Sequence, residues 1–537
     1  MTRLKTRRPA VPPTNDRPVG EKAWRPWGGL ALAILVGAAA YAYVFDAKLY
    51  LGGDNAAYYL LGKALAGGDG FTSIWKATNP PHSHFPPGYP AIIAVAMTLG
   101  LASTTAIKLV NGALLLGSVA LLFPVVRRMT GSAAFAGVAC AFVALNAHVL
   151  YYGTIMMSEV PFLFLTTLAL YGATRVDLER APWRDGWFWA TLAALVASVY
   201  VRSIGVAAVF GLVAYFAWQR RWWHAALAGA LSVAAVIPWQ LRSAALGGGG
   251  HVKPLLMVNP YQPDLGQATL ADLGARVLAN LGRYVTAELP TVLLPIVERS
   301  VGGRAALTGA LGIVLVAAVL AGVWRLRRLR TLVAAYLVGT FGILLLWPDV
   351  WTGIRFVLGV APLLTALALW GLLGGASAAA ARFGRARPVS PLWLLPLLLL
   401  AWPPIQALHE QAARPYPPDW ANYFRLAEWA RENTPEDAVI SVRKEEMFYL
   451  FAERPTTRFR YTTDTQAVLD GLDEAGTDYV VFASLGFGQP TAYLGPAIQS
   501  RPDRFPLVAR LPNPETYVFQ MLPDTARAAR PGAPEVP

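Results

Sequence analysis

Long apolar runs separated by short arginine-rich segments constrain this chain more than any other feature. About eleven runs approach the ~20 residues that a membrane-spanning helix requires, the shorter ones with help from flanking residues. They cover residues 27–45, 106–126, 133–150, 160–173, 187–200, 204–218, 223–239, 305–324, 331–347, 356–373 and 391–406. The sequence therefore predicts an α-helical polytopic membrane protein with about 11 transmembrane helices, within a range of roughly 10–13.

Composition supports this class and excludes others. The chain has 537 residues, of which 55% are hydrophobic and only 15% are charged, whereas soluble domains carry about 25% charged residues. A net charge of +14 alone would suggest nucleic acid, but the arginines cluster between apolar runs, as in cytoplasmic loops. We therefore expect no nucleic-acid partner. The single cysteine, Cys140, excludes an intrachain disulfide and a cysteine-based zinc site.

The arginine clusters also predict an orientation. The positive-inside rule places the basic tail 1–26 in the cytoplasm, together with residues 127–128, 175–184, 220–221, 325–330 and 382–387. All of these clusters fall on the cytoplasmic side only if residues 85–126 make one net crossing of the membrane. Residues 90–101 should therefore form a membrane-embedded or juxtamembrane helix rather than a full span. Loops 47–90 and 241–304, and everything after 406, should then lie outside. We expect a bacterial inner (plasma) membrane protein with an extracytoplasmic C-terminal domain.

The chain changes character after the last apolar run. Residues 27–406 form the predicted transmembrane domain, 407–523 an extracytoplasmic α/β domain, and 524–537 a disordered tail. Roughly 110 residues suffice for one small domain of this kind. Within it the pattern predicts helices at 445–453 and 465–475 and strands at 478–483, 507–511 and 516–521. A surface helix is predicted at 271–284 in the second large outer loop.

The first outer loop is the candidate reaction centre. It is far longer than the usual ~4–6 residues, and long ordered loops tend to carry function. Asp54 lies in GGDNAAYY near its start, and Glu159 lies in MMSEVPF at the outer start of a later apolar run. Each has a structural alternative, since Asp suits a helix N-cap and Ser-Glu-x-Pro suits a helix beginning. Two carboxylates on one membrane face nevertheless suggest a joint catalytic site.

Basic residues fall on the same predicted face. Arg202, Arg242 and Arg355 stand at the outer ends of apolar runs, and Lys76 lies in the first loop. Snorkelling to lipid phosphate could explain any one arginine. Three arginines and a lysine on the side of two carboxylates indicate instead a pocket for a phosphorylated ligand, because guanidinium groups match phosphate oxygens.

Further loop residues could serve the acceptor or hold a metal. His82 and His84 precede FPPGYP, which contains Tyr89, and we assign these three to acceptor handling or to shaping the loop. Two histidines without a third are a weak metal signal, so we assign no metal ligands; a divalent metal stays an alternative and no cofactor is required. The chain has no Walker A loop, GxSxG elbow, HExxH or CxxC motif.

The order of these motifs resembles the GT-C superfamily of membrane glycosyltransferases. The resemblance rests on an anchor, an outer loop with an early Asp, the Pro-Pro-Gly-Tyr-Pro re-entry, Ser-Glu-x-Pro-Phe, an outward Arg-x-x-Gly, and Arg-Phe before a late apolar run. It is nearest to the bacterial family akin to protein O-mannosyltransferases and the lipid A aminoarabinose transferase. The sequence departs from that pattern at Asp54-Asn55, often Asp-Glu, and at His84-Phe85, where a basic residue often stands.

The resemblance implies an inverting glycosyltransferase that uses a polyprenyl-phosphate-linked sugar on the outer membrane face. It implies Asp54 as the first-loop catalytic acid and Glu159 as the second acidic position. Arg202, Arg242, Arg355 and Lys76 would bind the donor phosphate, and the acceptor would be a lipid, a glycan or a protein. The main alternative is a transporter or lipid flippase, which would show paired halves and broken helices. A third is a non-catalytic assembly protein.

Overall fold

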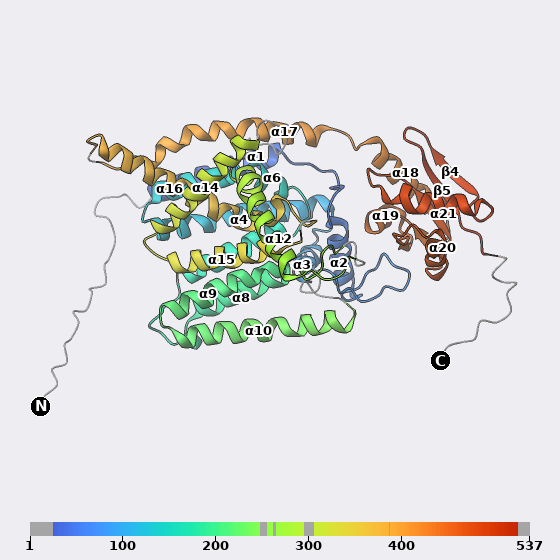
Figure 1. Ribbon diagram of the computed structural model, residues 1–537, viewed down its shortest axis with the longest axis horizontal. Coiled ribbons are helices and arrows are strands. Elements are labelled where there is room, and N and C mark those ends of the chain that lie inside the picture. Colours follow the sequence, from blue (N-terminus) through green and yellow to red (C-terminus); the bar gives the residue numbers. More distant parts are fainter. Residues whose placement is uncertain are drawn as a thin grey trace, which may run out of the picture.

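The computed structural model describes residues 25–247, 255–260, 265–294, 305–348, 350–385 and 387–524. The sequence-based expectations for the basic tail, for the C-terminal tail beyond 524 and for parts of loop 241–304 lie outside these residues. The described chain is mostly helical and ends in a five-stranded sheet (Figure 1). This confirms the predicted fold class in its coarse form.

The helical part is a bundle of apolar helices. Its elements are α1 (Arg25–Tyr43), α2 (Asn55–Gly67), α3 (Gly88–Thr98), α4 (Thr104–Thr130), α5 (Ala133–Ala144), α6 (Ala147–Gly153), α7 (Glu159–Ala173), α8 (Gly186–Val201), α9 (Val206–Trp218), α10 (Trp222–Ala245), α12 (Leu270–Arg283), α13 (Leu289–Leu293), α14 (Ala305–Trp324), α15 (Arg330–Leu346), α16 (Ala361–Arg382) and α17 (Trp402–Ala413). The surface helix predicted at 271–284 is confirmed as α12.

Few of these helices could cross a bilayer unaided. Among the described residues, four helical segments are long and apolar enough, and α5 with α6, bent by 60°, would make a fifth. The other apolar helices are shorter, α3 being 11 residues long. At about 1.5 Å per residue α3 is much shorter than the ~30 Å hydrocarbon core, which agrees with a helix that does not span. The number of about eleven spans stays a prediction.

Small residues let neighbouring helices approach closely. A Cβ added at Gly371 of α16 would collide with the carbonyl oxygen of Ala318 on α14, and one added at Gly322 of α14 would collide with that of Leu367 on α16. Close backbone contact through small residues is typical of helix pairs in membranes, where packing rather than the hydrophobic effect drives association. The α14–α16 pair therefore depends on these two glycines.

The C-terminal α/β unit, residues 418–520, lies at one end of the bundle (Figure 1). It consists of α18 (Pro418–Asn433), β1 (Ile440–Ser441), α19 (Glu445–Ala452), β2 (Thr456–Thr457), α20 (Thr465–Glu474), β3 (Tyr479–Phe482), α21 (Gly495–Ser500), β4 (Leu507–Leu511) and β5 (Thr516–Gln520). The strand order is β2-β1-β3-β5-β4; β2, β1 and β3 are parallel, and β5 pairs antiparallel with β3 and β4. The helices and strands predicted for this region are confirmed to within a few residues.

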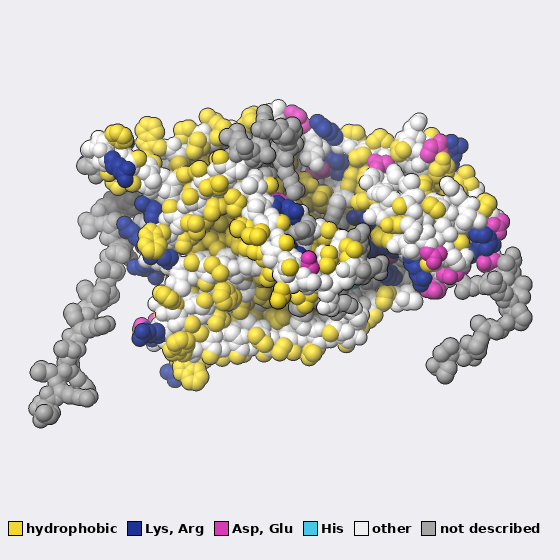
Figure 2. Space-filling view, viewed as in Figure 1, with side chains coloured by type: hydrophobic (Ala, Val, Ile, Leu, Met, Phe, Trp, Pro, Cys, Tyr) yellow, Lys and Arg dark blue, Asp and Glu magenta, His cyan; other side chains and the backbone are white. Residues whose placement is uncertain are grey.

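Basic side chains gather at the opposite end of the bundle from the C-terminal α/β unit, on the left in Figure 2. Arg128 lies close enough to Arg175 and to Arg328 to interact electrostatically with each of them, and the backbone N–H of Arg327 donates to the carbonyl of Met129 at 3.0 Å. Three arginine clusters that are separate in the sequence therefore meet at one end. The orientation of that end in a membrane stays a prediction.

Site-directed labelling tests that orientation. The only native cysteine, Cys140, is buried, so Arg328→Cys and Glu436→Cys, both at exposed positions, can be labelled individually. Because arginine-rich ends stay in the cytoplasm, a membrane-impermeant maleimide should label Glu436→Cys in intact spheroplasts and Arg328→Cys only after permeabilisation. Labelling of both from the same side would contradict the predicted topology.

Candidate active site

Asp54 occupies the position just before α2 without acting as a cap. Gly53, with φ of 63°, turns the chain into the helix, and the Asp54 side chain makes no capping hydrogen bond. Its carboxylate is 36% exposed, and Oδ2 lies 3.6 Å from Nη2 of Arg355. Asp54 therefore occupies the N-cap position of α2, but its side chain does not cap the helix and is accessible to a substrate.

Glu159, the first residue of α7, is the buried counterpart of Asp54. Its side chain is only 1% exposed, and Oε1 accepts hydrogen bonds from Arg202 Nη1 at 2.6 Å and from Arg355 Nε at 3.0 Å. Arg202 Nη1 also donates to Ser158 Oγ at 3.1 Å. The second oxygen, Oε2, has no hydrogen-bond partner among the described residues. A buried carboxylate is tolerated when it is paired and hydrogen-bonded in this way.

The two arginines come from backbone irregularities at the same end of the bundle. Arg202 follows the end of α8 in extended conformation, and Arg355 lies in the short 3-10 helix Ile354–Phe356. Burial would lower the pKa of Arg355, but the carboxylates of Glu159 and Asp54 outweigh it and raise that pKa above its ordinary value. The structure thus brings together Asp54, Glu159, Arg202 and Arg355, which the sequence predicted as one site.

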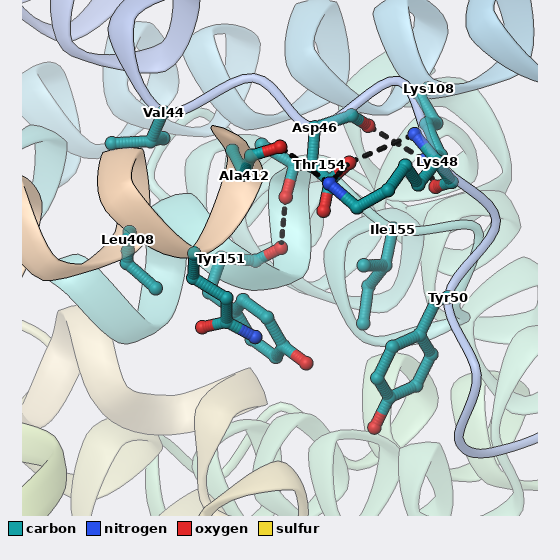
Figure 3. Close-up of a pocket in the computed structure, with 11 residues that line it drawn as sticks. Val44, Asp46, Lys48, Tyr50, Lys108, Tyr151, Thr154, Ile155, Leu408 and Ala412 are labelled. Carbon is teal, nitrogen blue, oxygen red and sulfur yellow. Dashed lines mark hydrogen bonds and ion pairs between the residues drawn. The ribbon is translucent and has the colours of Figure 1, made fainter. Parts of the chain in front are cut away.

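A second charged cluster fixes the start of the first outer loop (Figure 3). Lys108 of α4 is 1% exposed, and its ammonium donates to the backbone carbonyls of Asp46, at 2.8 Å, and of Lys48. Lys48 in turn pairs with the Asp46 carboxylate at 2.8 Å and donates to the carbonyl of Ala412 in α17. These residues line a cavity of about 40 Å³. The loop is therefore held to α4 and α17 shortly before it reaches Asp54.

Asn55 fixes the short backbone segment between this cluster and Asp54. Its side chain is fully buried, and Nδ2 donates to the carbonyl of Tyr50 at 2.7 Å. This bond closes the turn that contains the two glycines ahead of Asp54. The departure from Asp-Glu to Asp54-Asn55 thus has a local explanation, because an amide can donate this bond and an ionised carboxylate cannot.

Arg242 stands apart from the other two arginines. Its Nη1 donates to the carbonyl of His82 at 2.6 Å and its Nη2 to that of Phe71 at 3.3 Å. Its guanidinium also lies over the rings of Phe71 and Trp239. In the structure Arg242 therefore holds the outer loop against the end of α10, and a phosphate contact for it stays a prediction.

The remaining predicted residues have different surroundings. His82 is buried, its Nε2 accepts from the N–H of Phe85 at 3.0 Å, and its Nδ1 lies 3.0 Å from Ser73 Oγ. Burial, with smaller effects of nearby cations, lowers the pKa of His82 to about 3, so this ring is neutral at pH 7. Lys76 and His84 are exposed. Tyr89 is fully buried, and its hydroxyl accepts from Asn111 at 2.9 Å.

These residues do not fit a divalent metal as they stand. The guanidinium of Arg355 already lies between the carboxylates of Asp54 and Glu159, and both ring nitrogens of His82 have protein partners. Among the described residues, no three His, Cys, Asp or Glu side chains lie together in a way that could hold a metal. We therefore assign these residues no role in binding a metal ion.

Sequence reasoning missed three residues near Asp54. Ser158 contacts Arg202, as above, and lies 3.4 Å from the hydroxyl of the buried Tyr58. Tyr58 is one helical turn after Asp54, a spacing that could have revealed it. Lys444, just before α19, reaches the site only because α19 packs on α2. Burial lowers the pKa of Lys444, and the carboxylates of Glu446 and Asp54 oppose that shift. No sequence signal marks this lysine.

Comparison with known proteins identifies the fold. Residues 87–246 match the family model described as dolichyl-phosphate-mannose-protein mannosyltransferase, whereas no curated protein matches the sequence significantly. The structure of ArnT from Cupriavidus metallidurans bound to undecaprenyl phosphate is similar, with a TM-score of 0.56 and 15% identity over 92% of this chain and 98% of that chain. The chain has the GT-C fold.

A second structure with this fold is similarly close. The Archaeoglobus fulgidus oligosaccharyltransferase, solved in complex with Zn and sulfate, gives a TM-score of 0.56 at 12% identity over 90% of this chain and 72% of that chain. The resemblance to the GT-C superfamily is thereby confirmed, while identities this low concern the fold alone. The segment matched by the family model contains Glu159 and Arg202; Asp54 precedes it and Arg355 follows it.

The buried ion pairs of this site should matter for stability. Glu159→Gln leaves two partly buried guanidiniums without their shared carboxylate, so we expect a loss of about 3–5 kcal/mol, measured by thermal unfolding in detergent. Glu179→Gln is the matched control, because Glu179 is 81% exposed and pairs with Arg221 at the surface; it should cost about 0–1 kcal/mol. Equal losses in the two variants would contradict the buried pairing.

Proposed function

We propose that this chain is an inverting glycosyltransferase that moves a sugar from a polyprenyl-phosphate-linked donor to an acceptor on the extracytoplasmic membrane face. The observation that carries the proposal is an accessible carboxylate, Asp54, beside two guanidiniums that a buried Glu159 holds in place. Such a site combines a base with a preformed cationic environment for a leaving phosphate.

Each residue has a distinct task in this reaction. Asp54 accepts the proton of an acceptor hydroxyl or amine, whose oxygen or nitrogen attacks the anomeric carbon of the sugar. The bond from that carbon to the phosphate oxygen breaks, and the polyprenyl phosphate leaves with the electron pair. A single displacement inverts the anomeric centre. Arg202 and Arg355 stabilise the negative charge on the departing phosphate, and Glu159 acts as a positioning residue for both.

The geometry supports Asp54 as the base. Its 3.6 Å separation from Arg355 Nη2 exceeds a hydrogen bond, so the carboxylate is not committed to that partner. Arg355 uses Nε for Glu159 and has further N–H donors for phosphate oxygens. Asp54 can therefore accept a proton from the acceptor while Arg355 binds the phosphate of the donor.

Other features support the donor and the membrane face. The similar ArnT structure was solved with undecaprenyl phosphate, a lipid whose tail can remain among membrane helices while its phosphate reaches an end of the bundle. Here Asp54 belongs to the end near the C-terminal α/β unit, since α2 packs on α19, and the arginine clusters gather at the other end (Figure 2). Under the positive-inside rule the reaction site would then be extracytoplasmic.

The rival functions fit less well. A transporter or flippase would carry its charged groups near mid-membrane between two related halves, whereas Asp54, Arg202 and Arg355 lie at helix ends or in loops. An assembly protein would not need an accessible carboxylate beside two held guanidiniums.

Replacing the base gives the sharpest test. Asp54→Asn keeps the side-chain shape but removes the proton acceptor, so turnover of polyprenyl-phosphate sugar should fall about 10²–10⁴-fold. The assay measures polyprenyl phosphate released in membranes, and donor binding should change little. Asp69→Asn, at an exposed position in the same loop, is the control and should retain activity. Near-normal release by Asp54→Asn would refute this loop as the reaction centre.

The arginines should control donor affinity. Loss of a charge-assisted phosphate contact is worth about 1.5–3 kcal/mol, or roughly tenfold or more in affinity. Arg355→Ala and Arg202→Ala should therefore raise the donor concentration needed for half-maximal rate. Arg460→Ala removes an exposed arginine that pairs with Glu474 and should leave this value unchanged. If the donor concentration needed for half-maximal rate is unchanged in both site variants, these arginines have a structural role and do not bind the donor.

A further inference from the structure

The three parallel strands of the C-terminal α/β unit create an edge of the type that binds ligands. The chain passes from β1 through α19 to β2 on one side of β1, then through α20 to β3 on the other side. In open α/β sheets, ligands bind outside the carboxyl ends of the strands where the strand order reverses in this way. The residues that follow β1 and β3 therefore occupy the expected binding position.

Those residues are cationic and aromatic. Arg443 and Lys444 follow β1, and the chain after β3 turns sharply through Leu485 and Gly486, whose φ angles are 49° and 73°. This turn brings Phe487 over the cations: its ring centroid lies 4.3 Å from Arg443 Cζ and 5.5 Å from Lys444 Nζ. We call Arg443, Lys444 and Phe487, together with Tyr461, the sheet-edge platform; Arg443 Cζ lies 5.5 Å from the Tyr461 ring.

The two cations of the platform have no direct ion-pair partner in the described part of the chain, although the carboxylates of Glu446 and Asp54 lie close enough to Lys444 to act on it electrostatically. Arg443 donates from Nε to the neutral amide oxygen of Gln489 at 3.3 Å, and within the described part of the chain no carboxylate forms an ion pair with Arg443 or Lys444. By contrast, Arg458, which follows the neighbouring strand β2, is paired with Glu445 at 3.0 Å. An anion with phosphate or carboxylate oxygens is the ligand that would satisfy Arg443 and Lys444.

The platform lies near the proposed reaction centre, because the Asp54 carboxylate is close enough to Lys444 to act on it electrostatically. Leu485 and Phe487 pack in the same apolar cluster as Tyr58 and Met157, which lie beside Asp54. The Lys444 backbone is fixed by the hydroxyl of Tyr423, which donates to the Lys444 carbonyl at 3.0 Å. A ligand on the platform would thus lie next to the carboxylate that deprotonates the acceptor.

We infer that the sheet-edge platform binds the acceptor, and that the acceptor is a saccharide carrying a phosphate or carboxylate group. The half-buried ring of Phe487 offers apolar surface on which the C–H face of a sugar ring packs, and Tyr461, whose ring is stacked on Tyr493, adds its exposed edge. Arg443 and Lys444 hold the anionic group of the ligand. This inference rests on the proposed function, because it assigns the substrate of the same site. It makes the C-terminal α/β unit part of the substrate-binding surface rather than a separate module.

Binding of small probes to the full-length protein tests the inference without requiring turnover. Ligand-observed NMR on the protein in nanodiscs compares mannose 6-phosphate, mannose and inorganic phosphate. We expect mannose 6-phosphate to bind more tightly than either of the others, because it alone offers both a ring face and an anion. The double variant Arg443→Gln/Lys444→Gln should weaken its binding about tenfold or more. Arg510→Gln, which removes an exposed arginine paired with Glu515 on the antiparallel half of the sheet, should retain it.

Other variants separate this result from alternative explanations. If the double variant has a lower Tm than the unmodified protein, Arg443→Lys and Lys444→Gln are measured singly. Asp54→Asn should bind mannose 6-phosphate normally, so loss of donor turnover and loss of acceptor binding are distinguishable. The inference is overturned if mannose binds as well as its phosphate, if the platform variants bind normally, or if only Arg355→Ala abolishes binding, which would place the phosphate at the donor site.

Discussion

The shared carboxylate of Glu159 is the interaction on which the site depends. One oxygen accepts from two guanidiniums, at 2.6 Å and 3.0 Å, on a side chain that is almost fully buried. The three residues begin α7, follow α8 and precede α16, so a single buried charge joins segments far apart in the sequence. Removing one member of such a group is costly because the others stay buried without compensation. The pairing fixes Arg355, and Arg355 defines the surroundings of Asp54.

The position of Asp54 depends on a second set of contacts, which act on the backbone. Lys108 and Lys48 bind carbonyl groups around the start of the outer loop, Asn55 closes the turn onto Tyr50, and Arg242 holds the later part of the loop through the carbonyls of Phe71 and His82. Because cations satisfy these carbonyls, a long loop can be ordered with little regular structure of its own. The residues that shape the loop therefore differ from those proposed to contact a substrate.

The sequence could predict features that depend on local pattern. Apolar runs located most helices of the bundle, and short strand-like segments located β3, β4 and β5, because hydrophobic character is a property of short segments. Asp54, Glu159, Arg202 and Arg355 could be grouped because topology placed all of them at one membrane face. The different role of Arg242 could not be predicted, since an arginine beside carbonyls has the same sequence signal as one beside a phosphate. Lys444 was equally hidden, because its approach to Asp54 depends on how α19 packs against α2.

Charge balance connects the two halves of the molecule. Asp54 and Glu159 carry two negative charges, and Arg202 and Arg355 carry two positive ones, so these four side chains together are neutral. A phosphorylated donor and an anionic acceptor would each bring further negative charge into a region where water screens poorly. In the proposed arrangement, Arg443 and Lys444 supply additional positive charge from the C-terminal α/β unit, outside the helices that would hold the donor. In this proposal, the packing of α19 on α2 brings Lys444 near Asp54, and so determines whether the proposed reaction centre could accept two anions at once.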